Sequence, residues 1–186
     1  VLLPSGQVAE LVRQVVNRND KNEAVSMIEK DGRILLTAAS GKVINTGLVS
    51  VDGQNGQKAG SIELNSEKIT VVAEGSHLSA DGNGAGSDGG SILLLSDLKK
   101  GRAVLEKNVD VSARGAEAGG SGGMVELSGG RFLWASNVDV SAKNGKAGVF
   151  VLDPVNITIS DQADADGNVN VTTLSNQLKK SDVTLS

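Results

Sequence analysis

The only histidine of the chain, His77, occupies a position that aspartates fill in two later repeats. Each of these residues is followed by an aliphatic residue and then a serine, which aligns His77, Asp110 and Asp139. If the three runs stack as neighbouring β-strands, their aliphatic residues point inward and the three polar side chains form one outward column, with neighbours about 5 Å apart. The alignment therefore predicts a polar surface column in which His77 lies beside Asp110.

Two kinds of catalysis use residues of these types. A Ser-His-Asp triad needs one serine held against one base, with an oxyanion hole, whereas the serines here recur as repeated geometry. A polysaccharide lyase or hydrolase uses clustered carboxylates, which stacked Asp110 and Asp139 would provide. Carbohydrate grooves usually also carry exposed aromatic rings, and Trp134 is the only ring besides two phenylalanines. We expect no enzyme activity and no catalytic residue, and we keep a carbohydrate-active β-helix enzyme as the alternative.

Oxygen-rich turns raise the question of calcium. One such turn holds four oxygen-bearing side chains and another is flanked by two aspartates, and neither has the spacing of an EF-hand: Asp161, Asp164, Asp166 and Asn168; Asp81 and Asp88. The glycine-rich stretch 115–123 lacks the Gly-Lys-Ser/Thr ending of a phosphate-binding loop. We therefore expect neither a metal site nor a cofactor, and we interpret the acidic turns as solvated.

The chain is built from two alternating sequence patterns. The first is an aliphatic alternation that contains a serine, at Ser50, Ser79, Ser112 and Ser141, with spacings of 29, 33 and 29 residues. The second begins with glycine and alternates aliphatic residues, and it starts at Gly32, Gly60, Gly90, Gly123 and Gly148. A looser apolar stretch lies between the two patterns. Three short strands in each repeat of about 30 residues indicate a parallel β-helix, expected to be right-handed.

The period of two along each strand predicts which side chains point inward. Four inward columns follow: Ile34/Ile62/Ile92/Val125/Phe150; Leu36/Leu64/Leu94/Leu127/Leu152; Val49/Leu78/Val111/Val140; and Val51/Ala80/Ala113/Ala142. Stacked aliphatic residues would fill the core, which explains why aromatic residues make up only 2% of the chain. The glycine-rich stretches 82–89 and 115–122 are expected to be corner loops, and the alternative for them is a flexible linker between two domains.

Both ends differ from the regular coils. Near the start, Val8, Leu11, Val12, Val15 and Val16 have the spacing of one helix face. Near the other end, Thr172 or Thr173 is expected to cap a short helix that carries Leu174 and Leu178, before a last strand. We therefore expect one β-helix segment of a longer protein over residues 1–186, with a helix and lead-in at 1–31, regular coils at 32–160, and the start of the next repeat at 161–186.

Composition excludes several classes of protein. The net charge of −4, with both signs interspersed, provides no basic stripe for nucleic acid. No apolar run approaches the roughly 20 residues that a membrane span needs, so no membrane insertion is expected. The chain has no cysteine, which rules out disulfides and suits a protein that crosses membranes unfolded.

Several motifs, in this order, resemble the filamentous-haemagglutinin-like exoproteins of bacterial two-partner secretion. The most specific is Val151-Leu152-Asp153-Pro154-Val155-Asn156-Ile157-Thr158-Ile159, which looks like the LLDP-x-[ND]-[IV]-T-I segment downstream of that family's secretion domain. Earlier and later parts of the chain also match the family: Glu10-Leu11-Val12, Val15-Val16-Asn17 and Gly32-Arg33-Ile34-Leu35-Leu36; Leu174-Ser175-Asn176-Gln177-Leu178 and Val183-Thr184-Leu185. Together these motifs cover almost the whole chain.

The resemblance implies the β-helical shaft of a large bacterial adhesin, a structural and interaction module. It implies export across the outer membrane of a Gram-negative bacterium by a dedicated two-partner-secretion transporter, and a location outside the cell or on its surface. It also implies a host-cell or surface receptor, protein or glycan, as partner. Some family members are instead toxin carriers or haem-acquisition proteins, and the family's secretion domain is not recognisable in this chain.

Overall fold

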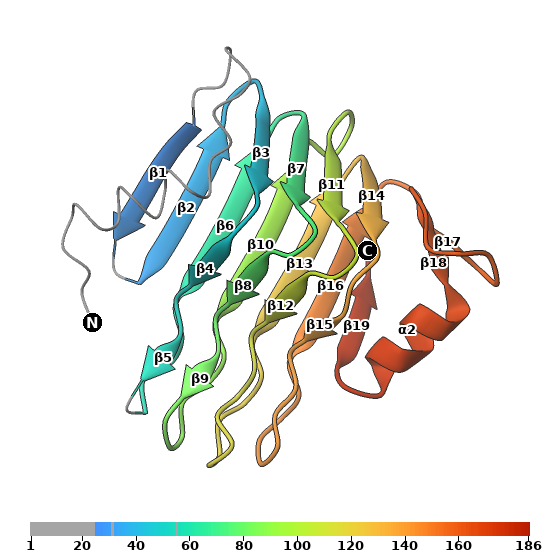
Figure 1. The fold of residues 1–186 in the computed structure, drawn as a ribbon. Helices are drawn as coiled ribbons and strands as arrows, with labels where there is room; N and C mark the ends of the chain where they lie inside the picture. Colours follow the sequence, from blue (N-terminus) through green and yellow to red (C-terminus); the bar gives the residue numbers. More distant parts are fainter. Residues whose placement is uncertain (1–24, 31, 55) are drawn as a thin grey trace.

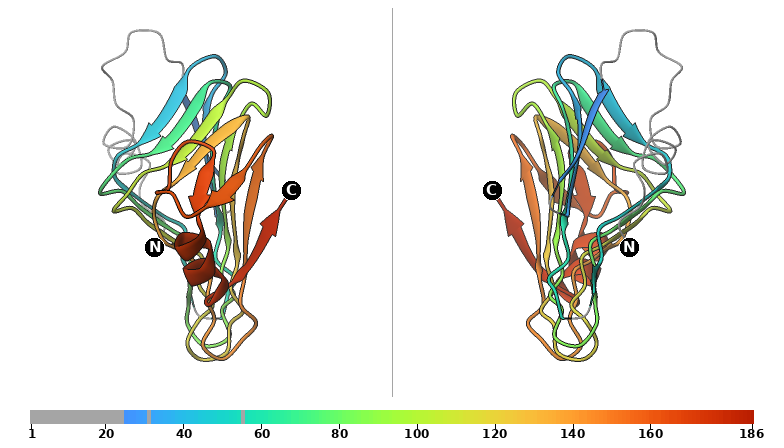
Figure 2. Two further views of the ribbon diagram at one scale, coloured as in Figure 1. Left: turned by 90° about the vertical axis from the view of Figure 1, so that its right-hand side faces the viewer. Right: turned by 90° about the vertical axis from the view of Figure 1, so that its left-hand side faces the viewer.

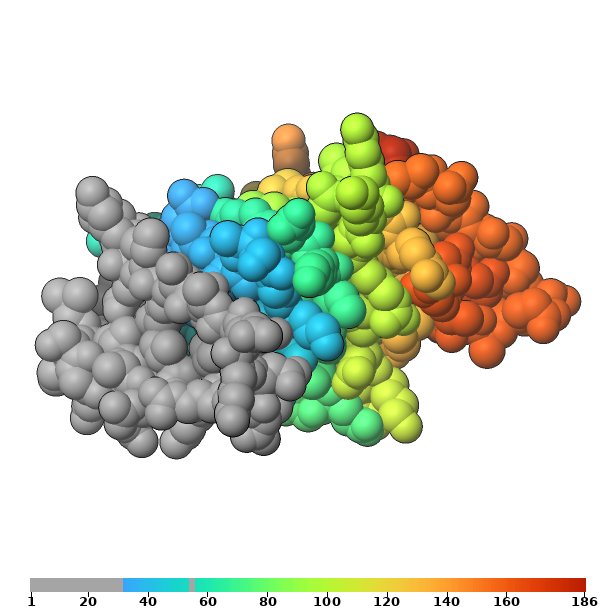
Figure 3. Space-filling view, turned by 90° about the horizontal axis from the view of Figure 1, so that it is seen from above, coloured from blue at the N-terminus to red at the C-terminus, as the bar shows by residue number. Residues whose placement is uncertain are grey.

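The chain forms a parallel β-solenoid in the computed structural model, which describes residues 25–30, 32–54 and 56–186. About 5 turns follow one another, about 29 residues apart. Figure 1 shows the equivalent strands of successive turns side by side, and Figure 3 shows the turns as bands that run in sequence order along the molecule. The all-β parallel β-helix predicted from the repeats is confirmed.

Three sheets form the walls of the solenoid. The largest has seven strands, in the order β1 (Val25–Lys30), β2 (Arg33–Ala38), β6 (Ser61–Ser66), β10 (Ser91–Ser96), β13 (Met124–Gly129), β16 (Val149–Pro154) and β19 (Asp182–Leu185). All neighbours in it are parallel except β1, which pairs antiparallel with β2. The sequence did not predict β1.

The other two walls have four strands each. One contains β3 (Lys42–Asn45), β7 (Ile69–Val72), β11 (Arg102–Leu105) and β14 (Arg131–Trp134), and the other contains β4 (Leu48–Ser50), β8 (His77–Ser79), β12 (Asp110–Ser112) and β15 (Val138–Asp139). A small fourth sheet pairs β5 (Gly53–Gln54) with β9 (Gly82–Asn83). Beyond it lie the corner loops, at the narrow end of the cross-section in Figure 2.

The core consists of stacked aliphatic side chains along the seven-stranded sheet. The register pairs Ile62 with Ile92 and Leu64 with Leu94, and it continues through both predicted columns in every coil. From Ile62 onward all members of these two columns are at most 1% exposed. The first two inward columns predicted from the period of two are therefore confirmed.

The β3/β7/β11/β14 wall contributes inward side chains that become larger from one coil to the next. One column reads Asn45, Val72, Leu105 and Trp134. The ring of Trp134 meets Phe150 edge to face, with 4.8 Å between ring centroids, and its indole N–H donates to the Ser136 carbonyl. The three aromatic residues, Phe132, Trp134 and Phe150, thus lie buried together in the core near the C-terminal end.

Glycine directly precedes five strands of the large sheet, β2, β6, β10, β13 and β16, and from Gly60 onward successive coils approach closely there. A β-carbon built on Gly90 would lie 1.9 Å from the carbonyl oxygen of Gly60, and one on Gly123 would lie 2.0 Å from that of Gly90. Gly60 and Gly148 meet the coil before them in the same way. We call these residues the glycine column: Gly32, Gly60, Gly90, Gly123 and Gly148. Its members, apart from Gly32, are fixed by backbone contact.

The third and fourth predicted columns are wrong in the last regular coil. The register pairs Val111 with Val138 rather than with Val140. The turn before β15 is two residues shorter than the turn before β12, and Ser136 compensates: its hydroxyl accepts from the Val109 backbone N–H at 2.9 Å and donates to the Glu106 carbonyl. The fourth column accordingly ends with Val140, which is fully buried, in place of the half-buried Ala142.

The last turn leaves the regular pattern. Strands β17 (Thr158–Ser160) and β18 (Asn168–Asn170) pair in parallel, and α2 (Val171–Leu178) leads to β19. Asn170, rather than Thr172 or Thr173, caps this helix, because its side-chain oxygen accepts from the Thr172 N–H. The buried Gln177 anchors α2 by donating to the Val138 carbonyl at 2.7 Å.

Two further findings concern helices. The short helix predicted near the C-terminal end is confirmed as α2, whereas the helix predicted around Leu11 falls outside the described residues. In the described part of the chain, no helix is long and apolar enough to cross a membrane.

Truncating a core leucine should destabilise the solenoid. Leu127 is fully buried between Leu94 and Leu152, so Leu127→Ala should lower the free energy of unfolding by about 2–5 kcal/mol in urea denaturation. Leu98→Ala is the matched control, because Leu98 is 51% exposed and should change stability little. Equal effects of the two substitutions would refute the burial described here.

A methyl group in the glycine column should be tolerated less well than an asparagine side chain at a loop tip. Gly123→Ala forces its β-carbon against the Gly90 carbonyl, and we expect a cost of at least about 3 kcal/mol or failure to fold. Gly86 has φ +76° with open space around it, so Gly86→Asn should cost about 1 kcal/mol or less. Thermal melts of both variants measure the difference, and a Gly123→Ala protein that melts like wild type would contradict the close approach.

Candidate functional site

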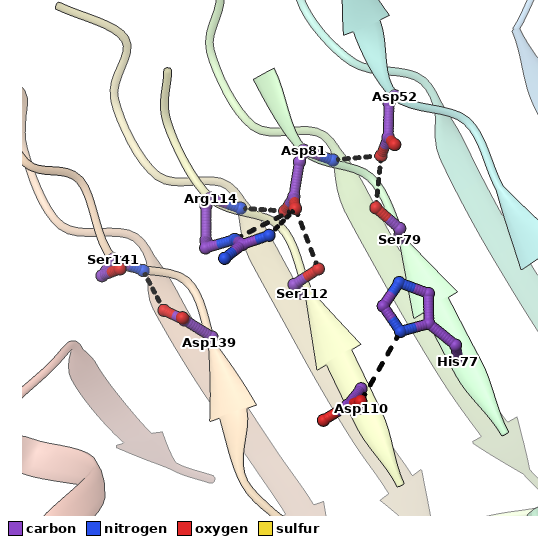
Figure 4. Close-up of polar contacts among 9 residues, drawn as sticks. All are labelled: Asp52, His77, Ser79, Asp81, Asp110, Ser112, Arg114, Asp139 and Ser141. Atoms are coloured by element: carbon purple, nitrogen blue, oxygen red, sulfur yellow. Dashed lines mark hydrogen bonds and ion pairs between the residues drawn. The ribbon is translucent and has the colours of Figure 1, made fainter. Parts of the chain in front are cut away.

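Polar side chains of successive coils contact one another at the corner that follows the β4/β8/β12/β15 wall. Two positions after each wall serine stands a charged residue: Asp52 after Ser50, Asp81 after Ser79, and Arg114 after Ser112. Figure 4 shows these side chains reaching from one coil to the next. We call the contacts among Asp52, Ser79, Asp81, Ser112 and Arg114 the corner ladder.

Each aspartate of the corner ladder binds the coil that follows it. Asp52 accepts hydrogen bonds from the Ser79 hydroxyl and from the Asp81 backbone N–H, the latter at 2.8 Å. Asp81 repeats both contacts one coil later, with the Ser112 hydroxyl at 3.1 Å and the Arg114 backbone N–H at 2.7 Å. Two of the four repeated serines, Ser79 and Ser112, are therefore buried donors to carboxylates.

In the third coil the corner ladder has a cation, Arg114, at the position that Asp52 and Asp81 occupy in the first two coils. Its guanidinium donates to Asp81 through Nε at 3.0 Å and Nη2 at 2.6 Å. The hydrogen bond that the guanidinium donates to Asp81 raises the pKa of Arg114; burial opposes this, and the charges of Asp81, Asp139 and Asp52 reinforce it. The Asp81 side chain is 8% exposed and that of Arg114 is 52% exposed, so the buried charge is paired and the guanidinium faces solvent.

The predicted polar column is right for two members and wrong for the third. His77 pairs with Asp110 in the register, and its Nδ1 lies 3.8 Å from Asp110 Oδ2 at the exposed surface. Asp139 instead pairs with Ser112, because the shorter turn shifts β15 by two residues. Its Oδ1 accepts from the Ser141 N–H at 3.1 Å (Figure 4). Asp110 and Asp139 are therefore not stacked as the carboxylate pair that the enzyme alternative used.

The serines next to His77 are already engaged. The hydroxyls of Ser79 and Ser112 donate to Asp52 and Asp81, and the histidine ring faces Asp110. The repeated serines thus form the ladder contacts described above, as expected for repeated geometry.

A groove of about 540 Å³ opens beside the corner ladder. Asp81, Arg114 and Asp139 line it together with Glu117 and Lys143, and Asn83, Ser141 and several glycine and alanine residues of the corner loops complete its walls. The position of the groove follows from the changed register, which pairs Asp139 with Ser112 and so brings it close to Arg114 on the coil before it. Sequence reasoning missed Arg114 and Asp52, although both stand at the same place in the repeat as Asp81.

The corner loops are ordered from coil to coil. The Gly86 N–H donates to the Ala118 carbonyl at 3.1 Å, and the Gly122 N–H donates to the Lys146 carbonyl at 2.8 Å. Ser87 is fully buried, and its hydroxyl accepts from the Gly56 N–H. These contacts continue the solenoid through the loops, so the alternative of a flexible linker between two domains is wrong.

The acidic turn near the C-terminal end serves the fold. Asp166 binds Arg102 at 2.8 Å and also Arg131, and so ties the last turn to β11 and β14. Asp164 accepts from the Asn170 N–H and the Thr173 hydroxyl at the start of α2. In the described residues, no group of three His, Cys, Asp or Glu side chains could hold a metal ion.

Removing the central carboxylate of the corner ladder should be costly. Asp81→Ala leaves the Ser112 hydroxyl and the Arg114 N–H without their acceptor, and we expect a loss of about 1–3 kcal/mol in the free energy of unfolding. Asp110→Ala is the control: its side chain is 84% exposed, and stability should stay within about 0.5 kcal/mol of wild type. Chemical denaturation of both proteins measures this, and an Asp81→Ala protein as stable as the control would show that the ladder contributes nothing.

Comparison with known proteins adds no family to these findings. No family model, no curated protein and no solved structure matches the chain. The likeness to filamentous-haemagglutinin-like exoproteins therefore rests on the sequence motifs alone.

Proposed function

We propose that this chain is a shaft module of a secreted or surface-exposed bacterial adhesin, exported by two-partner secretion. The observation that carries the proposal is the parallel stacking of coils, in which the strands of the three walls, apart from β1, pair with their equivalents in the neighbouring coils. A protein of this kind holds binding surfaces at a distance from the cell, which requires a long and stiff body.

The direction of the hydrogen bonds suits a shaft. Strand-to-strand hydrogen bonds run along the solenoid axis, so stretching the molecule would have to break whole rows of them together. The core columns repeat from coil to coil, whereas the outward positions vary freely, as in the register column Leu35, Glu63, Leu93, Glu126 and Val151. A repeated interior with a variable exterior supports a scaffold whose surface is free to interact.

Three properties of the chain support the proposed export route. The segment from Val151 to Ile159 resembles the family motif, and it spans the end of β16 and most of β17, where the regular coils give way to the last turn. Because the strands of each coil pair with those of the neighbouring coils, a chain that emerges through a narrow transporter can fold coil by coil. The absence of cysteine means that no disulfide has to form on the way.

Export can be tested in a bacterium that carries the gene. Antibodies raised against this chain should label intact cells or the culture medium, and a deletion of the outer-membrane transporter gene should remove that signal. A secreted protein that uses another route is the control and should be unaffected. Antigen confined to the cell interior, or unchanged export in the deletion strain, would refute the proposal.

A further inference from the structure

The groove beside the corner ladder has hydrogen-bonding capacity that the fold does not use. A guanidinium has five N–H donors, and in Arg114 those of Nε and Nη2 face Asp81. In the described part of the chain, Nη1 of Arg114 has no hydrogen-bond acceptor within the protein, and half of this side chain is exposed. The groove therefore presents fixed donors whose orientation is set by Asp81.

Acceptors and a second cation lie around these donors. Asp139 uses Oδ1 for the Ser141 N–H, which leaves its other oxygen for a ligand. Lys143 and Glu117 face each other at 3.6 Å, with side chains 66% and 86% exposed. The groove thus mixes donors and acceptors within one space of about 540 Å³, a size that small ligands fill.

The charges of the lining select the class of ligand. Asp81, Glu117 and Asp139 oppose Arg114 and Lys143, which leaves a net charge of −1 (three carboxylates against two cations). Asp81 and Arg114 neutralise each other, so an anionic ligand would meet two carboxylates and one lysine. A cation would meet the same two carboxylates and one lysine; it could pair with Asp139, but it could not use the N–H donors of Arg114. Hydroxyl groups both donate and accept, and they match such a lining without an uncompensated charge.

The site is also held in place before any ligand arrives. The Arg114 backbone N–H is bonded to Asp81, and the Gly115 N–H donates to the Ser141 carbonyl at 2.9 Å. Donors fixed in this way lose little conformational freedom on binding, which favours affinity.

We propose that this groove, between Arg114, Asp139 and Lys143, binds a neutral saccharide through its hydroxyl groups. The site goes beyond the shaft function, and it is tested separately, because binding is measured on the purified chain and export in cells. No aromatic ring lines the groove, so binding depends on hydrogen bonds and each site is weak.

The test titrates the chain with cellobiose, lactose and maltose by saturation-transfer-difference NMR. At least one of them should bind saturably, with a Kd on the order of 1 mM. Asp139→Asn should weaken that binding about tenfold, because it removes a charge-assisted acceptor while keeping the oxygen that bonds Ser141. Lys143→Ala should also weaken it. Asp110→Asn, a carboxylate outside the groove, is the matched control and should bind like wild type.

The outcomes separate clearly once circular dichroism shows that each variant is folded. Saturable binding that weakens in Asp139→Asn and Lys143→Ala but not in Asp110→Asn supports the site. Absence of binding by all three disaccharides overturns it, and so does binding that all variants retain. Binding of only digalacturonate or of calcium ions, tested in parallel, also overturns it, because the groove would then select charge.

Discussion

The close backbone approach along the glycine column is the constraint on which the rest of the structure depends. At Gly90 and Gly123 the chain turns into the large sheet in contact with the carbonyl of the coil before it, leaving no room for a β-carbon. This contact fixes where each coil enters the sheet, and the in-register pairing of β6, β10, β13 and β16 follows. Equivalent side chains then stack at the strand spacing of about 4.8 Å, which produces the Ile and Leu columns of the core.

The sequence predicted this wall well because two independent signals agree in it. The glycines mark the entry of each strand, and the period of two marks its inner face, so the pairing of Leu94 with Leu127 could be read directly. The reason for the glycines could not be predicted from the sequence, because it is a contact between the backbones of different coils. In the β12/β15 wall the other marker was the repeated serine, which aligned Ser112 with Ser141 and so predicted the wrong register. A shift of two residues preserves alternation, so the pairing of Val111 with Val138 was invisible to it.

The candidate site was predictable only in part, for a related reason. His77 and Asp110 are neighbours at the same position of the repeat, and an alignment finds such pairs. The corner ladder joins different positions, the serine of one coil and the aspartate of the coil before it, so no alignment column contains the contact between Ser112 and Asp81. A signal was nevertheless present, because the residues two positions after the serines read Asp52, Asp81 and Arg114. A cation that follows two stacked carboxylates relieves their repulsion.

The two departures from the repeat act together at this corner. If the turn before β15 had the length of the turn before β12, Asp139 would stack on Asp110 at the exposed surface, where two carboxylates repel each other and face solvent. The turn is two residues shorter, and Ser136 provides the hydrogen bonds that its backbone would have made. Asp139 therefore pairs with Ser112 and lies beside Arg114, the last residue of the corner ladder. In a protein whose coils otherwise repeat, one short turn and one exchanged charge are enough to create a groove with its own chemistry.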